Sequence, residues 1–517
     1  MPQDIEIRLA ARPDDLARLA HGALLRRLGQ GRAATRRLNS VYYDTPGLDL
    51  ARTGISLRVR KTGRAYVQTV KDSNSGSLAS QRGEWESPLP TPQPDLRFIP
   101  DPVMRERLIA LAGDAPVEPK LETDILRTTR RLRTEAGDEI ELAIDRGEIR
   151  TLAEDKAPLS VAEVELELKS GSPAALYEIA RELSESAPFT VTTESKAERG
   201  MRAIEGRGHA PYKAGRMGLR PDATAEDAFR ATLMHCLRHI AQNAPAVGEA
   251  RDVEGLHQLR VGLRRLRAAF SAFGPAFQGS RLDDLRERAK KLAGEFAETR
   301  DLDVLAIELL PLVEEAAQGR AGLAELRRRL DAMRDQSWEG CAALAGSKGF
   351  TGFLLDLAAA AETRAWREDA TPEMIAAFAR PASELARESL GRRERKARKR
   401  ARNLSSLSNE ERHALRIALK KLRYGAEFFA PLFPAKDVSA YLKKLSEAQD
   451  VFGALNDAAT VGHILERILK EARPAGADAL REGAAFVEGW HLGRIEPAWT
   501  NARKRWKRLA KAQPFWA

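Results

Sequence analysis

The chain has 517 residues, which is too long for one ordinary hydrophobic core, so we expect two or three domains. It holds 85 Lys and Arg against 74 Asp and Glu, but residues 1–210 carry 32 basic and 33 acidic residues. The positive excess therefore lies in the C-terminal part. Such a bias attracts polyanions, among them nucleic acid, anionic lipid and phosphate polymers, without choosing between them.

Cysteine usage and hydropathy exclude several classes of protein. Cys236 and Cys341 are the only two cysteines and lack a metal-ligand spacing, so a disulfide framework is excluded and a reducing compartment is favoured. The first residues, "MPQDIEIRLAARPDD", carry charge where a signal peptide needs an apolar run. No stretch approaches the roughly 18 apolar residues of a membrane-spanning helix. We expect a cytoplasmic protein without a membrane partner.

Residues 5 to about 170 alternate apolar and polar side chains with a period of two, which is typical of β-strands. Turn-forming stretches such as "KTGR" and "EAGDE" separate several of these segments. The predicted strands are 5–9, 38–43, 55–61, 65–72, 82–88, 124–134, 140–150 and 159–169. Helices are predicted near 13–28, 101–112 and 173–186.

Charged residues on these strands are sorted by sign. Glu163, Glu165 and Glu167 share one strand face, whereas Arg58 and Arg60 share another. One interpretation is a set of solvated outer faces. The alternative is a closed barrel with a polar lumen, because eight strands enclose room for one small ligand. The sorting favours the barrel, so we predict an α+β fold built on an eight-stranded antiparallel β-barrel.

If the sorted faces share one lumen, it contains the groups that phosphoryl chemistry requires. Carboxylates are hard oxygen ligands suited to Mg²⁺ or Mn²⁺, and arginine and lysine donate to phosphate oxygens. The acidic set is Asp4, Glu6, Glu163, Glu165 and Glu167, and the basic set is Arg8, Arg58, Arg60, Lys71, Arg82 and Arg127. No Walker-type glycine-rich loop is present, so side chains would have to hold the phosphates. Asp145 and Glu141 are weaker candidates.

Residues 206–221, "GRGHAPYKAGRMGLRP", lack apolar periodicity and predict a linker between residues 1–205 and 222–517. Beyond it the apolar period becomes helical almost throughout. "HQLRVGLRRLR", beginning at His257, recurs as "HALRIALKKLR", beginning at His413. In each copy His and three basic residues fall on one arc of about 80°. These are His257, Arg260, Arg264 and Arg267, and His413, Arg416, Lys420 and Arg423.

The repeat extends beyond this basic stripe. Asp301 follows His257 by 44 residues, and Asp457 follows His413 by the same distance. The constant spacing predicts duplicated all-α bundles, about 222–375 and 376–517, packed around a pseudo-twofold axis. A solvated basic face remains the alternative for one copy. The two histidines are interpreted as hydrogen-bond donors or satisfied core groups, not as metal ligands.

Two further basic tracts, 391–402 and 503–511, raise nucleic acid as an alternative ligand. Few aromatic residues lie near them, and no helix-turn-helix, RRM or zinc-finger pattern is present. The residues therefore favour a phosphate polymer over nucleic acid.

The N-terminal half resembles the CYTH domains, or triphosphate tunnel metalloenzymes, over about residues 1–205. "DIEIRL" stands at the family signature ExExK and is followed in order by "VYYDTPGLDL", "ISLRVRKTG", "QTVK", "QRGEWE", "ETDILR", "IELAIDRGEI", "EVELELKSG" and "SKAERG". The chain departs from the signature at Asp4 and Arg8. Asp reaches one methylene less far than Glu, and Arg is a planar fork where Lys is a point donor.

This resemblance implies an eight-stranded barrel that hydrolyses or cyclises triphosphate compounds with a divalent metal, here as an inorganic triphosphatase. Glu165 or Glu167 would orient the attacking water. By position, the implied metal ligands are Asp4, Glu6, Glu163 and Glu165. The implied phosphate clamp is Arg8, Arg58, Arg60, Lys71, Arg82, Arg127 and Lys196.

Residues 222 to 517 resemble the CHAD domain, through "VEGLHQLRVGLRRLR", "ETRDLDVL", "HALRIALKKLRYGAEFF" and the final "PFW". The resemblance implies polyphosphate binding by the two basic stripes and an association with polyphosphate granules. Two alternatives to the triphosphatase stay open: a polyphosphate-binding protein without catalysis, and a hydrolase or cyclase acting on an organic triphosphate.

Overall fold

The structure is a computed structural model that describes residues 5–19, 22–72, 83–152, 156–274, 277–320, 322–404, 406–471 and 477–517. The chain forms two compact units. The first comprises Met1–Tyr212, Leu237–Ala250 and Leu344–Arg364; the second comprises Lys213–Cys236, Arg251–Ala343 and Ala365–Ala517.

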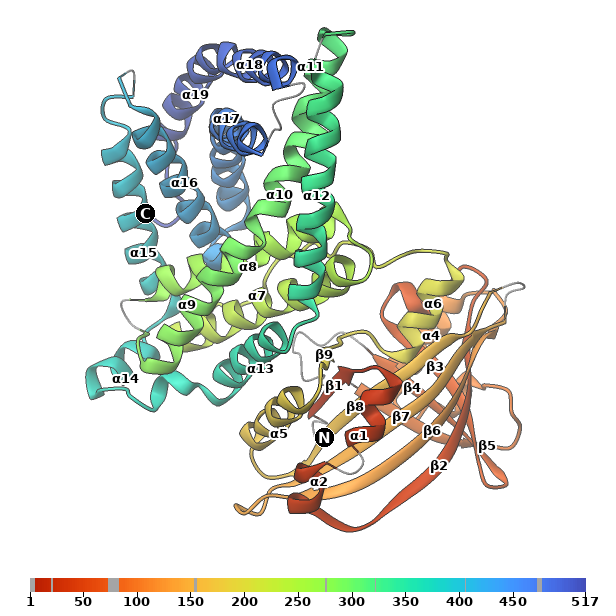
Figure 1. The fold of residues 1–517 in the computed structure, drawn as a ribbon. Helices are drawn as coiled ribbons and strands as arrows, with labels where there is room; N and C mark the ends of the chain where they lie inside the picture. The colour runs from red at the N-terminus through yellow and green to blue at the C-terminus, as the bar shows by residue number, and fades with distance from the viewer. Residues whose placement is uncertain are drawn as a thin grey trace. The chain divides into compact units, whose positions relative to one another are not determined.

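An antiparallel sheet of nine strands dominates the first unit (Figure 1). In chain order the strands are β1 (Ile5–Ala10), β2 (Gly29–Asp44), β3 (Ile55–Thr62), β4 (Ala65–Asp72), β5 (Gly83–Leu89), β6 (Glu118–Arg133), β7 (Glu139–Thr151), β8 (Leu159–Ser170) and β9 (Thr190–Val191). Across the sheet the order is β5-β4-β3-β2-β6-β7-β8-β1-β9. All eight predicted strands are present, and β9 is an additional one.

The predicted closed barrel of eight strands is wrong, because the nine-stranded sheet is open. Its edges are β5 and β9, and within the described residues no ladder joins them. β1 pairs with β8 along one edge and with β9 along the other, the latter through Leu9 and Ala10. The edge strand β5 contains Pro88, which has no backbone N–H to donate to a further strand.

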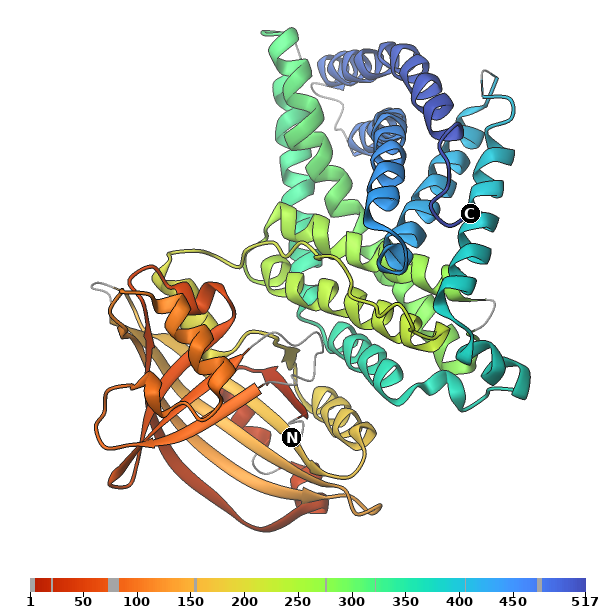
Figure 2. The ribbon, with the colours of Figure 1, turned by 180° about the vertical axis from the view of Figure 1, so that it is seen from behind.

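Alternation along β3 separates apolar from polar side chains. On β3, Ile55, Leu57 and Val59 are buried in a core cluster with Met104 and Leu108 of α4 (Pro102–Ala112), seen in orange against the sheet in Figure 2. The residues between them on β3 therefore point to the opposite face. That face carries the candidate site.

Short helices surround the sheet. They are α1 (Pro13–Leu19), α2 (Ala23–Leu28), α3 (Asp49–Arg52), the 3-10 helix η1 (Leu96–Phe98), α5 (Pro173–Ser186) and α6 (Lys196–Ile204). The single helix predicted at 13–28 is two helices, whereas those near 101–112 and 173–186 match α4 and α5. Ala197 and Met201 of α6 pack in a cluster with Leu121 and Ile149, which brings the start of α6 to the sheet.

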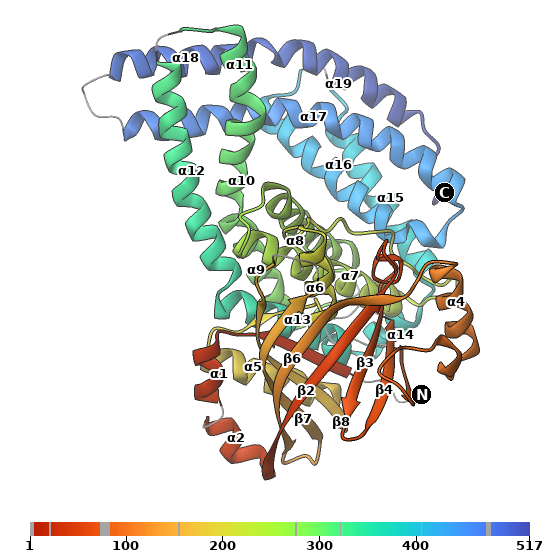
Figure 3. The same cartoon turned by 90° about the vertical axis from the view of Figure 1, so that its right-hand side faces the viewer.

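The rest of the chain is helical. Its elements are α7 (Ala225–Gly248), α8 (Val253–Phe273), α9 (Ser280–Glu295), α10 (Ala297–Asp303), the π-helical η2 (Val304–Leu309), α11 (Leu310–Ala316), α12 (Leu323–Ala345), α13 (Lys348–Thr363), η3 (Ala365–Arg367), α14 (Pro372–Ala379), α15 (Ala382–Arg400), α16 (Asn409–Phe429), η4 (Ala430–Leu432), α17 (Ala435–Lys470), α18 (Ala477–Gly493) and α19 (Ile495–Ala510). In the second unit α15 packs on α16, and α17 lies along α19 (Figure 3).

The two repeated sequences form equivalent helices. α8 and α16 each have 21 residues, pack on one another, and are capped at the N-terminus by Asp252 and Ser408. Phe273 and Phe429 each lie 16 residues after the histidine of their copy, and their ring centroids are 5.1 Å apart. Equivalent residues that contact one another are expected close to a pseudo-twofold axis.

Candidate functional site

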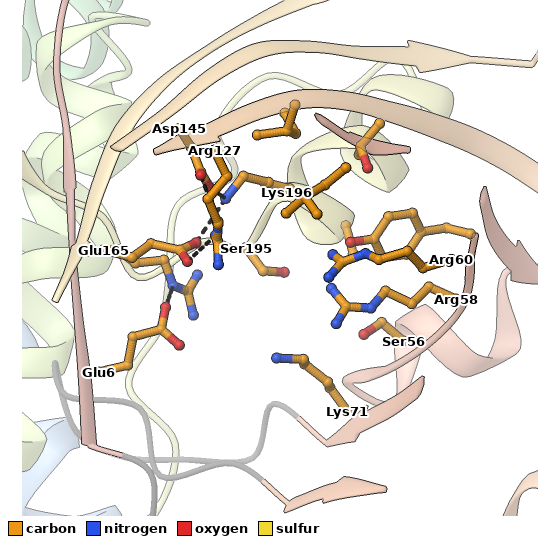
Figure 4. Close-up of a pocket in the computed structure, with 16 residues that line it drawn as sticks. Glu6, Ser56, Arg58, Arg60, Lys71, Arg127, Asp145, Glu165, Ser195 and Lys196 are labelled. Atoms are coloured by element: carbon orange, nitrogen blue, oxygen red, sulfur yellow. Dashed lines mark hydrogen bonds and ion pairs between the residues drawn. The ribbon is translucent and has the colours of Figure 1, made fainter. Parts of the chain in front are cut away.

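A pocket opens on the polar face of the sheet, at the start of α6 (Figure 4). Seven strands contribute to it, which is why its residues are scattered through the sequence. Its lining comprises Glu6, Arg8, Leu38, Tyr42, Ser56, Arg58, Arg60, Lys71, Thr123, Ile125, Arg127, Asp145, Glu165, Ser195, Lys196 and Ala197. Arg58, Arg60 and Lys71 lie on one side of this space, and the carboxylates lie on the other side together with Arg127 and Lys196.

Arg58, Arg60 and Lys71 form the cationic side, on β3 and β4. Lys71 pairs with Glu84 at 2.7 Å, and Arg58 is 3.6 Å from the same carboxylate. Arg60 donates from Nε to Oγ of Ser40 at 2.9 Å. Burial and the charge of Arg58 lower the pKa of Arg60 to about 10. Three cations with two nearby carboxylates, Glu84 and Glu86, leave this side with one positive charge in excess.

Tyr42 lies beside these arginines and was not predicted as a site residue. The positive charge of Arg58 acts on its hydroxyl. Burial alone would raise the pKa of Tyr42, but the charges of Arg58, Arg60 and Lys196 lower it below its ordinary value. The tyrosine therefore reports the positive potential of the pocket.

Three carboxylates form the opposite side. Ligand oxygens of Asp145, Glu163 and Glu165 all lie within 4.8 Å of one another, and the first two side chains are 0% exposed. Three cations neutralise them. Arg127 bonds to Asp145 and Glu165, Arg199 bonds to Glu163, and Lys196 bonds to all three carboxylates.

These contacts fix the charge states. Burial opposes ionisation of Glu165, but Lys196, Arg127 and Arg8 together hold its pKa well below the ordinary value. The same carboxylates raise the pKa of Lys196 and of Arg127 despite their burial. Glu165, Lys196 and Arg127 are therefore charged at neutral pH.

Arg8 lies on the carboxylate side. Its Nε donates to Glu6 at 2.7 Å, and Glu6, Glu165 and Glu163 raise its pKa despite burial. Its Nη1 is buried without a hydrogen-bond partner, as is Nε of Arg58. Buried guanidinium donors without acceptors are costly, so each favours an anion that would accept from it.

The pocket brings together most of the predicted residues. Glu6, Arg8, Arg58, Arg60, Lys71, Arg127, Glu165 and Lys196 line it, and Glu163 lies behind Lys196. Glu167 pairs with Lys169 and lies opposite Glu6 on the neighbouring strand. Asp4 and Arg82 fall outside the described residues. Within the described residues the carboxylate cluster contains Asp145, a weaker candidate, and does not contain Glu6.

Arg199 and Ser195 were also missed. Both belong to the "SKAERG" segment, in which only Lys196 was singled out. The signal that could have found Arg199 is its place one helical turn after Lys196, on the same side of α6.

The second unit gathers cations around a half-buried carboxylate, that of Asp301. Asp301 of α10 is within electrostatic range of Arg260 and Arg264 of α8, of Arg300, and of Arg416 of α16. The two repeated stripes therefore meet here. Burial raises the pKa of Asp301 although the four arginines lower it.

Not every predicted stripe residue takes part equally. Burial, with Arg264 and Arg300 nearby, lowers the pKa of Arg260 to about 10 although Asp301 opposes the shift. Nη1 of Arg260 and Nε of Arg264 are buried without hydrogen-bond partners. Arg423 is paired with Glu427 at 2.8 Å and with Gln449 at 3.1 Å.

The other stripe residues, like Arg260 and Arg264, lie on α8 or α16. Burial and the charges of Arg300 and Arg264 lower the pKa of His257. Arg267 and His413 are exposed, and Lys420 is half-buried. Within the described part of the chain, no helix is long and apolar enough to cross a membrane.

Comparison with known proteins identifies two families. A family model for the CYTH domain matches residues 2–201, and one for the CHAD domain matches residues 231–466. The crystal structure of the CHAD domain from the plant Ricinus communis is 29% identical, with a TM-score of 0.51 over 59% of this chain and 98% of that one.

Two further proteins are similar to parts of the chain. "Uncharacterized protein MT2285" of Mycobacterium tuberculosis is 28% identical over 336 residues, which cover 59% of this chain and 62% of that protein. A putative adenylyl cyclase from Hippeastrum, for which a dominant triphosphatase activity is reported, is 18% identical with a TM-score of 0.29. It covers 40% of this chain and 97% of its own.

Proposed function

Since the chain carries a CYTH domain followed by a CHAD domain, we propose that it is a metal-dependent hydrolase of inorganic triphosphate whose helical part binds polyphosphate. One observation carries the proposal. Arg8 and Arg58, each with a buried donor that lacks a partner, line the same pocket as Asp145 and Glu165, two members of the carboxylate cluster. A phosphate chain supplies acceptors for the first group, and a divalent cation suits the second.

The division of the pocket suggests a role for each side. Arg58, Arg60 and Lys71 would hold the terminal phosphates, with Arg8, Arg127 and Lys196 along the chain. Mg²⁺ or Mn²⁺ would be held by Glu163 and Glu165 with Asp145, and Asp4 and Glu6 remain proposed ligands. Such an ion neutralises the charge that develops on the phosphate oxygens. Glu165 or Glu167 would orient the attacking water.

The lining favours an inorganic substrate over an organic triphosphate. Among the described lining residues, Tyr42 is the one aromatic side chain, and the charge of Arg58 acts on its hydroxyl. A nucleoside or thiamine ring is ordinarily held by stacking or by an apolar slot. Besides Tyr42, the described lining supplies few apolar side chains for such a slot: Leu38, Ile125 and Ala197.

The test is phosphate release from tripolyphosphate with Mg²⁺ or Mn²⁺, compared with long-chain polyphosphate, ATP and thiamine triphosphate. We expect tripolyphosphate to be the best substrate and Arg58→Ala to lose about 10²-fold in rate. Arg37→Ala is the matched control, because Arg37 pairs with Asp124 on the other face of the sheet. Equal rates for wild type and Arg58→Ala would place the reaction elsewhere.

Polyphosphate binding by the helical part rests on the arginines around Asp301. Arg260→Ala should weaken binding of long-chain polyphosphate, whereas Arg328→Ala should not, because Arg328 is exposed and paired with Glu325. Competition with DNA distinguishes a phosphate polymer from nucleic acid, since salt sensitivity is common to both. Polyphosphate binding with no hydrolysis of any triphosphate would instead support a binding protein.

A further inference from the structure

The Lys196 side chain lies inside the carboxylate cluster of the pocket. Its Nζ is 2.7 Å from Oδ2 of Asp145 and 2.8 Å from Oε1 of Glu165, and it also bonds to Glu163. Three carboxylates with oxygens within 4.8 Å of one another repel unless a cation lies between them. The ammonium thus occupies the place where a divalent cation would satisfy the same oxygens.

Each carboxylate would keep a partner without the lysine. Arg127 holds Asp145 and also bonds to Glu165, while Arg199 bonds to Glu163. Counting Glu6 and Arg8, which pair with one another beside the cluster, four carboxylates would then face three guanidinium groups, with one negative charge in excess. Departure of the ammonium therefore leaves a site that attracts a cation and retains its framework.

The Lys196 side chain can also move while its backbone stays fixed. It is the first residue of α6, whose start is fixed by a capping box: Ser195 N donates to Glu198 at 2.7 Å, and Glu198 N donates to Ser195 at 3.2 Å. The backbone is thereby anchored, whereas a lysine side chain has a flexible four-carbon stem. The ammonium lies with the carboxylates, across the pocket from the arginines of β3 (Figure 4), and its charge also acts on Tyr42.

We propose that the Lys196 ammonium and a divalent cation compete for Asp145, Glu163 and Glu165, and that metal binding releases the lysine to a phosphate oxygen. This inference rests on the proposed function of the pocket. It makes Lys196 a positioning residue with two positions, one on carboxylates and one on phosphate. Because binding linkage is reciprocal, metal and phosphate chain should each raise the affinity for the other.

The test is titration of the full-length protein with Mn²⁺ alone, measured by the electron paramagnetic resonance signal of free Mn²⁺. Lys196→Met removes the competing charge, and we expect Mn²⁺ to bind about tenfold more tightly, within the usual range of coupled sites. Lys196→Arg retains the charge and should not tighten binding. Lys120→Met is the matched control, since Lys120 pairs with Glu118 at 2.6 Å and is similarly buried on the same sheet.

Thermal unfolding of each variant establishes that it is folded. The wild-type protein provides a second measurement: tripolyphosphate should tighten its Mn²⁺ binding, and this gain should be smaller in Lys196→Met. Equal or weaker Mn²⁺ binding by a folded Lys196→Met would overturn the inference, as would absence of saturable binding to both proteins. If Lys196→Met does not fold, the wild-type protein alone decides: a Mn²⁺ affinity that tripolyphosphate leaves unchanged would overturn the inference.

The two proposals fail separately. Hydrolysis of tripolyphosphate by the wild type, with unchanged Mn²⁺ affinity in Lys196→Met, would retain the proposed function and reject the competition. Tighter Mn²⁺ binding by the variant, without hydrolysis by the wild type, would retain the competition and reject catalysis.

Discussion

Arg127 holds Asp145 with two parallel hydrogen bonds, from Nε at 2.7 Å and from Nη2 at 2.6 Å. Asp145 is fully buried, so its charge depends on this fork and on Lys196. Removing one partner of a buried pair leaves a charge without compensation. We expect Arg127→Met to lower the free energy of unfolding by about 3 kcal/mol, measured by urea denaturation.

An exposed pair of the same geometry provides the control. Arg37 donates from Nε to Asp124 at 2.7 Å and also pairs through Nη2, but its side chain is 70% exposed. Exposed pairs contribute about 0–1 kcal/mol. Arg37→Met should therefore cost far less than Arg127→Met, and equal costs would contradict the importance of burial here.

Glu165 makes the pocket sensitive to acid. Its folded-state pKa lies well below the ordinary 4.5 because Lys196, Arg127 and Arg8 outweigh its burial. A depressed pKa contributes stability above the unfolded-state value, and that stability is lost as pH falls below about 4.5. We expect wild type to lose stability more steeply than Glu165→Gln on acidification, measured as unfolding free energy against pH.

The same substitution should affect catalysis at neutral pH. Glu165→Gln removes a proposed metal ligand and leaves Lys196 and Arg127 with one carboxylate fewer. We expect phosphate release from tripolyphosphate to fall about 10²-fold or more. A variant as fast as wild type would exclude Glu165 from the reaction.

The tyrosinate absorbance of Tyr42 can report the positive potential of the cationic side. Its pKa is lowered because Arg58, Arg60 and Lys196 outweigh burial. In an alkaline titration, the tyrosinate absorbance lost in Tyr42→Phe should therefore appear below the ordinary pKa of 10. Tyr42→Phe should also raise KM for tripolyphosphate a few-fold with little change in kcat. A Tyr42 that ionises above pH 10 would contradict a positive pocket.

The alternating sequence correctly predicted which side chains share the polar face. Glu6 lies opposite Glu167, and Arg8 lies opposite Glu165, as the common parity of these positions requires. Side chains alternate between the two faces along each strand, and pairing between strands keeps side chains of the same face together. The face was therefore predictable, whereas partners across strands, such as Arg127 with Asp145, depend on the register itself.

Strand limits and closure were predicted less well. β2 begins at Gly29, well before the predicted residue 38, because its first half is exposed on both faces and carries no apolar alternation. In this half, Gly29, Gln30 and residues 34–37 pair with β6 alone, with an irregularity between Gln30 and Ala34. The two-residue β9 is too short to produce a periodic signal, yet it occupies the edge of β1 and so bears on closure.

Asp301 places one negative charge among the arginines proposed to bind polyphosphate. Arg260, Arg264, Arg300 and Arg416 are all within its electrostatic range, so the carboxylate competes with a phosphate for them. We expect Asp301→Asn to bind long-chain polyphosphate about tenfold more tightly at low salt, with the difference shrinking as salt screens it. Isothermal titration calorimetry of both proteins measures this. Asp478→Asn, at an exposed pair with Arg481, should leave affinity unchanged.

The pH dependence of polyphosphate affinity tests independently whether Asp301 opposes binding of the anion. Because burial raises the pKa of Asp301, its carboxylate becomes protonated as pH falls from neutrality toward that raised value. Wild-type affinity for polyphosphate should then rise toward that of Asp301→Asn. His257, whose pKa is lowered by burial and by Arg300 and Arg264, gains a proton in both proteins, so their difference isolates Asp301. Parallel pH profiles for the two proteins would show that Asp301 does not oppose the anion.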